Sequence, residues 1–79
     1  MNSNISYRVI YEDDISNHVI TDIFRIGFCD DCNILICWYA DGRFKVIERE
    51  LIKKVEQVIK FWNGSMKVVN VPLNEIFSA

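Results

Sequence analysis

The chain has 79 residues, of which 51% are hydrophobic and 13% aromatic, so we expect one small domain spanning 1–79 and can exclude disorder. Its formal net charge of −2 lacks the basic excess with which general nucleic-acid binders contact phosphates, so nucleic acid is an unfavoured partner. No apolar run approaches the roughly 18 residues of a membrane span, and the N-terminus has no signal-peptide pattern. We therefore expect a cytoplasmic protein with no membrane partner.

The charge is unevenly placed along the chain. Residues 1–42 carry seven acidic and two basic side chains, whereas residues 43–79 carry seven basic and four acidic ones. This is either ordinary solvated charge or a polarised surface that steers a protein partner. The chain is also rich in Ile and Asn and poor in Ala, which is compatible with AT-rich coding and a small bacterial or phage accessory protein.

The first half of the chain alternates in the manner of strands. Residues 5–12 place four apolar side chains on one face and polar ones on the other, which predicts a half-buried strand. An acidic turn follows. Residues 18–28 fit either a helical stripe or a strand, and we favour a strand because β-branched residues are frequent there.

A hairpin is predicted around Asp41-Gly42, which lies between the apolar runs 33–39 and 43–48. This dipeptide is typical of a two-residue type I′ turn, which would pair Tyr39 with Phe44. One face of the hairpin would then carry Leu35, Cys37, Tyr39, Phe44 and Val46. The other face would carry Ile34, Ile36, Trp38 and Ile47, with Lys45 among them.

The period changes from two to 3.6 over residues 49–62, where an apolar stripe predicts an amphipathic helix closed by Asn63-Gly64. Residues 66–71 predict a last strand, which Pro72 ends. The expected fold is therefore α+β: a small antiparallel sheet of four to five strands, in the order β-β-β-β-α-β, with one helix on one face. The alternative is a small SH3-like β-barrel.

The cysteines supply the only metal-like pattern. Cys29 and Cys32 have the spacing of half a zinc site, and Cys37 and the single histidine, His18, would have to complete it. The predicted hairpin places Cys37 among apolar residues, where cysteine is usually a small hydrophobe. We therefore expect no metal and no cofactor, with these four residues as the only candidates. A thioredoxin-like redox pair is disfavoured because the motif lies between strands.

The apolar hairpin face is the feature that points to function. One helix can cover only one side of the sheet, so Ile34, Ile36, Trp38, Lys45 and Ile47 are the candidate partner-binding residues. With no nucleophile beside an evident base, we expect no enzyme. We expect a protein-interaction module, such as an adaptor or inhibitor, that forms a homodimer or docks on another protein.

The alternative function is a zinc-stabilised or single-stranded nucleic-acid-binding module. Its base-stacking platform would use the aromatic side chains of the strands and of the predicted helix. These are Tyr7, Tyr11, Trp38, Tyr39, Phe44 and Trp62.

Overall fold

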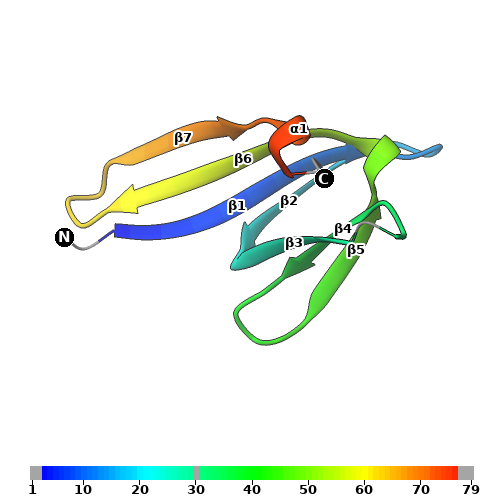
Figure 1. The fold of residues 1–79 in the computed structure, drawn as a ribbon. Helices are drawn as coiled ribbons and strands as arrows, with labels where there is room; N and C mark the ends of the chain where they lie inside the picture. Colours follow the sequence, from blue (N-terminus) through cyan, green and yellow to red (C-terminus); the bar gives the residue numbers. More distant parts are fainter. Residues whose placement is uncertain (1–2, 30, 77–79) are drawn as a thin grey trace.

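The computed structural model describes residues 3–29 and 31–76, and within them seven strands form two antiparallel sheets (Figure 1). The strands are β1 (Ser3–Glu12), β2 (Asn17–Ile23), β3 (Arg25–Cys29), β4 (Ile34–Trp38), β5 (Phe44–Glu48), β6 (Ile52–Phe61) and β7 (Met66–Val71). A 3-10 turn, η1 (Arg49–Leu51), precedes β6, and a four-residue helix, α1 (Leu73–Ile76), follows β7.

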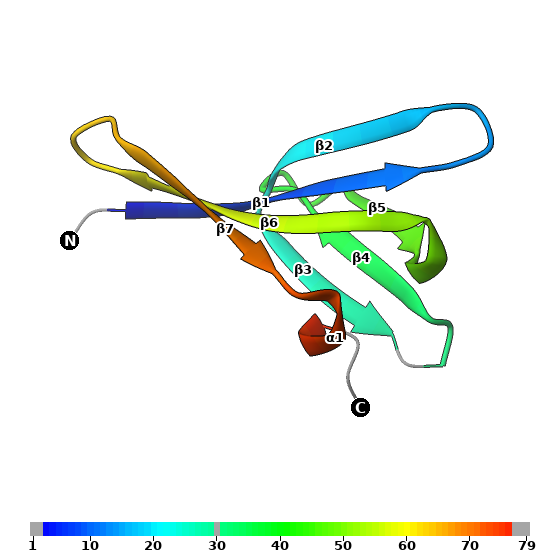
Figure 2. The same cartoon turned by 90° about the horizontal axis from the view of Figure 1, so that it is seen from above.

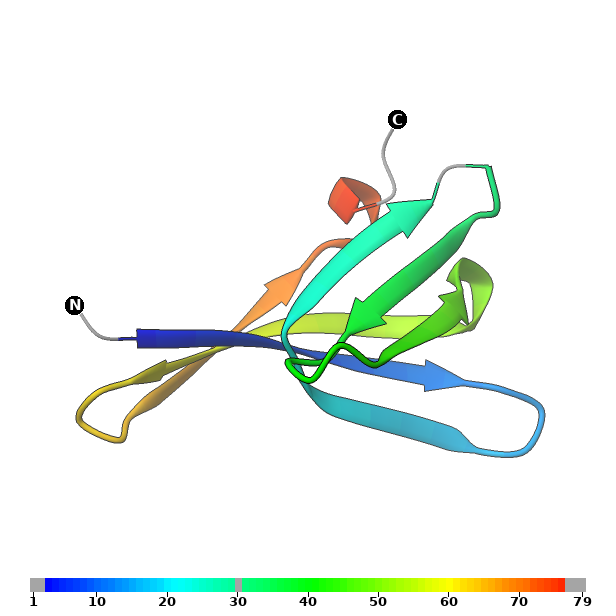
Figure 3. The ribbon, with the colours of Figure 1, turned by 90° about the horizontal axis from the view of Figure 1, so that it is seen from below.

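The larger sheet has the order β2-β1-β6-β7 and the smaller one the order β3-β4-β5. The smaller sheet crosses one half of the larger sheet as a second layer (Figures 2 and 3). The chain passes from one sheet to the other at Phe24, whose N–H donates to the carbonyl of Trp38 at 2.7 Å. Just before this corner, Asp22 adopts a positive φ of 59°, at an irregularity in the pairing of β1 with β2.

The antiparallel, strand-rich character expected from the sequence is confirmed. The predicted strands over 5–12 and 66–71 are β1 and β7, and the ambiguous stretch 18–28 is strand rather than helix, as β2 and β3. The strands form two sheets instead of the single sheet that we expected.

The predicted helix over 49–62 is wrong, because this segment forms η1 and the long strand β6. A bulge explains the misleading spacing: Tyr11 pairs with Ile52 and Val9 pairs with Val55, so β6 carries one extra residue between them. Two core residues three apart therefore point the same way in a strand. That spacing is the one expected for neighbouring turns of a helix.

The predicted hairpin exists, but its register is shifted by one residue. Trp38 pairs with Phe44, where Tyr39 was expected. The loop has three residues instead of two, because the N–H of Tyr39 donates to the carbonyl of Arg43 and Gly42 adopts a φ of 92°. Such a loop is a type I turn followed by a bulge at glycine. Because of this one-residue shift, every β5 side chain points to the face opposite to the one predicted.

The core lies between the two sheets. Its fully buried side chains come from both layers, with Val9, Ile23 and Val55 facing Leu35 and Cys37. Tyr11, Ile47 and Ile52 complete the buried cluster, and α1 adds Leu73 and Ile76 at its border.

A buried carboxylate lies on the opposite face of the larger sheet. Glu56 pairs across the strands with Arg8, whose Nη2 lies 2.6 Å from Oε1, and Lys54 Nζ lies 3.3 Å from Oε2. The Arg8 hydrogen bond, with a smaller contribution from Lys54, holds the pKa of the Glu56 carboxyl below its usual value. A charged partner thus compensates the burial of this carboxylate.

We predict that Leu35→Ala lowers the free energy of unfolding by about 2–5 kcal/mol, since the side chain is fully buried between the layers. Urea unfolding measures the loss. Val19→Ala, on the exposed side of β2 at 57% exposure, is the control and should cost less than about 1 kcal/mol. Equal losses at the two positions would contradict this placement of the core.

We predict that Glu56→Gln destabilises the protein at neutral pH. Because the pKa is lowered in the folded state, the stabilisation is present when the carboxylate is ionised and is lost as the pH falls through the folded-state pKa. Urea midpoints of the two proteins should therefore converge on acidification. Glu50→Gln, which changes an exposed glutamate outside this ion pair, is the matched control. A difference that persists unchanged in acid would refute the assignment.

Candidate functional site

The candidate site is the face of the smaller sheet that points away from the core, called here the outer face. Strand pairing orders its nine residues in three rows across β3, β4 and β5. The rows are Arg25, Trp38, Phe44; then Gly27, Ile36, Val46; then Cys29, Ile34, Glu48. These residues share one face because directly paired residues, and residues two apart in a strand, point the same way.

Large apolar side chains on this face remain open to solvent. Phe44 is 63% exposed and Val46 is 46% exposed, while Ile36 and Trp38 are half-buried beside them. The whole molecule exposes 5511 Å², whereas a compact monomer of 9.3 kDa exposes about 5,000 Å². The chain therefore leaves more surface uncovered than its size requires.

Trp38 is held in place by its two neighbours on β3. The guanidinium carbon of Arg25 lies 4.4 Å from the centre of the indole ring, a cation–π distance. A Cβ at Gly27 would lie 3.0 Å from Cζ3 of Trp38, so the absence of a side chain at Gly27 lets the indole lie flat across β3. The ring thus forms part of the surface.

Three of the five predicted partner-binding residues, Ile34, Ile36 and Trp38, lie together on the outer face. The shifted register places Lys45 and Ile47 on the opposite face, where Ile47 belongs to the core. Their places are taken by Phe44 and Val46, which sequence reasoning assigned to the other side. The loop length alone separates the two assignments, because Asp-Gly is compatible with loops of two or three residues.

The four candidate metal ligands do not converge. Cys29 and Cys32 are close, and hydrogen bonding and charge at Cys29 raise the pKa of the Cys32 thiol. Cys37 is on the core face of β4. His18 lies in the β1–β2 hairpin, with Nε2 2.9 Å from Asp13 Oδ2 and its ring stacked on that of Tyr11. Within residues 3–29 and 31–76, no group of three or more His, Cys, Asp or Glu side chains is placed to hold a metal ion.

The aromatic side chains that could have formed a stacking platform are divided between surfaces. Tyr11 is buried and Tyr39 borders the core, whereas Trp38 and Phe44 lie on the outer face. Trp62 is in the β6–β7 loop, and this hairpin extends beyond the smaller sheet (Figures 2 and 3). No common platform results from this arrangement.

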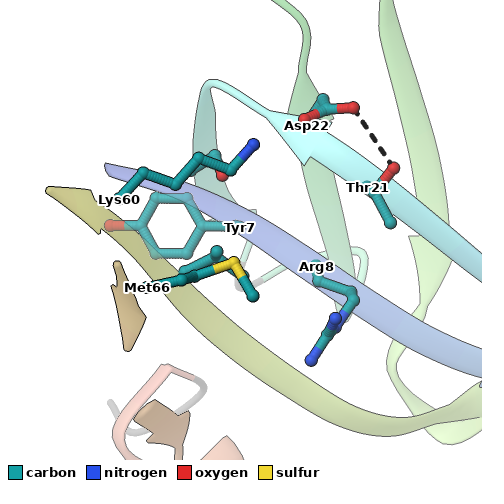
Figure 4. A pocket seen from close by; sticks show the side chains of 8 residues that line it. Tyr7, Arg8, Thr21, Asp22, Lys60 and Met66 are labelled. Atoms are coloured by element: carbon teal, nitrogen blue, oxygen red, sulfur yellow. Dashed lines mark hydrogen bonds between the residues drawn. The ribbon is translucent and has the colours of Figure 1, made fainter. Parts of the chain in front are cut away.

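A shallow pocket opens where β1, β2 and β6 meet (Figure 4). Its volume is about 130 Å³, below the roughly 300 Å³ of typical small-molecule sites. Arg8 lines it but is engaged by Glu56, and Thr21 donates to Asp22 at its rim. The pocket offers little room and few unengaged polar groups, so the outer face remains the stronger candidate.

Comparison with known proteins does not assign this chain to a class: no protein-family model matches it, and neither curated proteins nor solved structures show significant similarity. In the described part of the chain, no helix is long and apolar enough to cross a membrane.

We predict that two of the three thiols react with a disulfide reagent in the folded protein. Cys32 is exposed and Cys29 half-buried, whereas Cys37 is fully buried, and burial raises the pKa of its thiol to about 11. Since thiolate is the reactive form, Cys37 should react only after unfolding, as a thiol titration at about pH 8 would measure. Cys37→Ser should leave the native amplitude unchanged, and fast native labelling of Cys37 would contradict the fold.

Proposed function

We propose that this chain is a non-enzymatic protein-interaction module that forms a homodimer by stacking the outer faces of two copies. The observation that carries the proposal is the self-complementary pattern of the three rows. Arg25 and Glu48 occupy opposite corners of the outer face, with apolar residues between them. Among the described residues, neither makes a salt bridge within the chain.

The geometry of two-fold stacking follows from this pattern. A two-fold axis in the plane of the face, along the diagonal from Cys29 to Phe44, brings Arg25 of one copy opposite Glu48 of the other. The same operation sets Trp38 against Val46. The strands of the two copies then cross at nearly a right angle, which is one of the two established classes of sheet packing.

Two-fold stacking would bring opposite charges together and cover apolar side chains. Two ion pairs at opposite corners would lie on either side of a dry apolar contact, with Ile36 at its centre, the Trp38–Val46 contacts beside it and Phe44 at one end of the axis. Apolar residues inside and charged residues at the border are the usual arrangement of an interface. The cation–π contact already orients Arg25 over Trp38, which reduces the side-chain entropy lost on association.

The size of the face sets the expected strength. Three strands with five residues each span about 14 by 17 Å, well below the roughly 800 Å² per partner of a standard interface. We therefore expect a reversible dimer with a dissociation constant in the micromolar range. Small interfaces of this type are common in transient associations.

A charge exchange tests the proposal in sedimentation equilibrium between about 5 and 200 µM. Arg25→Glu should weaken the dimer about tenfold, because each corner then opposes two carboxylates. Adding Glu48→Arg to the same chain should restore the affinity, since the pair is re-formed with reversed sign. A double variant as weak as the single one would refute the proposed pairing.

Two phenylalanines provide a matched pair for the apolar part. Phe44→Asp should give a folded monomer, whereas Phe24→Asp should not alter the dimer, although the two side chains are 63% and 62% exposed. Phe24 lies at the corner between the sheets and outside the three rows. A wild-type protein that stays monomeric at all concentrations would overturn the homodimer and leave docking on a different protein.

A further inference from the structure

The β6–β7 hairpin extends beyond the smaller sheet, at the end of the larger sheet opposite to the β1–β2 hairpin (Figures 2 and 3). Its loop and the adjoining strand ends carry apolar side chains that the described residues leave largely exposed. Trp62 is 79% exposed, Met66 56%, and Phe61 and Val68 40% each. Ile5 on the neighbouring β1 is 50% exposed.

These side chains point to both sides of the hairpin. Phe61 and Ile5 lie on the face that continues toward the core, while Met66 and Val68 lie on the other face. A single flat protein partner would cover one of these faces and leave the other in water. A medium that surrounds the tip would cover both.

The tip of the hairpin carries only positive charge. From residue 57 to residue 74 the sequence contains no Asp or Glu, and the two charged side chains are Lys60 and Lys67. Both are exposed. Tryptophan with flanking lysines is typical of protein segments at the boundary between lipid headgroups and acyl chains. Anionic lipid attracts the lysines.

Several backbone polar groups of the tip form hydrogen bonds within the turn. The N–H of Phe61 donates to the carbonyl of Ser65 at 2.9 Å, and the N–H of Gly64 donates to the carbonyl of Phe61 at 3.0 Å. Asn63 Oδ1 accepts both the N–H and the hydroxyl of Ser65, at 3.0 and 2.7 Å. These internal hydrogen bonds reduce the cost of removing the turn from water.

We propose that the tip of the β6–β7 hairpin binds peripherally to anionic membrane surfaces, inserting Trp62 and its apolar neighbours at the lipid–water boundary while Lys60 and Lys67 contact the headgroups. The sequence expectation of no membrane partner rested on the lack of a spanning segment, and a hairpin tip at the surface does not span. The hairpin tip shares no residue with the outer face, so either proposal can fail without the other.

Co-sedimentation with vesicles tests it, comparing phosphatidylcholine alone with phosphatidylcholine containing about 30% phosphatidylserine. The protein should bind the anionic vesicles and bind the neutral ones much more weakly. Trp62→Glu should reduce binding at least about tenfold. Lys60→Gln and Lys67→Gln should each reduce it about fivefold, the equivalent of about 1 kcal/mol per lysine.

The matched control is Ile15→Glu, which adds the same charge at an 89% exposed apolar residue of the opposite hairpin and should leave vesicle binding unchanged. In a Trp38→Phe background, the emission of Trp62 should shift to the blue when anionic vesicles are added. Circular dichroism and urea midpoints confirm that each variant is folded.

Three results would overturn the proposal: equal binding to neutral and anionic vesicles, unchanged binding of Trp62→Glu, or no binding to either vesicle. If Trp62→Glu instead changes the sedimentation of the protein without lipid, the tip is a contact between copies of the chain. The charge exchange at Arg25 and Glu48 remains a separate measurement of the outer face.

Discussion

The mismatch in length between the two sheets determines how the rest of the molecule is organised. β1 and β6 are ten residues long, whereas β3, β4 and β5 have five residues each. A layer about 17 Å long therefore lies on strands about 33 Å long. The core forms only where the two overlap. Beyond the overlap, the larger sheet is a single layer, and apolar side chains on its strands meet solvent on both sides.

The two candidate surfaces are consequences of this partial overlap. The larger sheet covers only one face of the smaller sheet, so Phe44, Val46 and their neighbours on the opposite face are open to solvent. Among the described residues, no second layer covers the protruding part of the larger sheet (Figures 2 and 3). A chain of 79 residues that is 51% hydrophobic has more apolar side chains than so small an interior can hold. The excess is concentrated at these two sites.

The sequence predicted the strands well where side chains alternate without interruption, as in β1 and β7, and failed where an extra residue interrupts the alternation. The bulge between Ile52 and Val55 gave a strand the spacing of a helix. A single additional loop residue at Gly42 exchanged Lys45 and Ile47 for Phe44 and Val46 in the candidate site. The bulge and the loop length both depend on how a strand pairs with another strand. The periodicity of side chains along one segment carries no information about that pairing.

The long pairing of β1 with β6 also sets the order in which the chain can fold. Ser3 pairs with Phe61 and Val9 with Val55, so the two central strands of the larger sheet close a loop of some fifty residues, whereas β3, β4 and β5 join through short local turns. Closing a long loop costs entropy before its contacts form, which slows folding relative to local hairpins. During synthesis, β1 and β2 leave the ribosome well before β6 is made. Until then, β1 can pair with β2 but not with β6. In that interval its second edge is open, and self-association of the unfinished chain competes with folding.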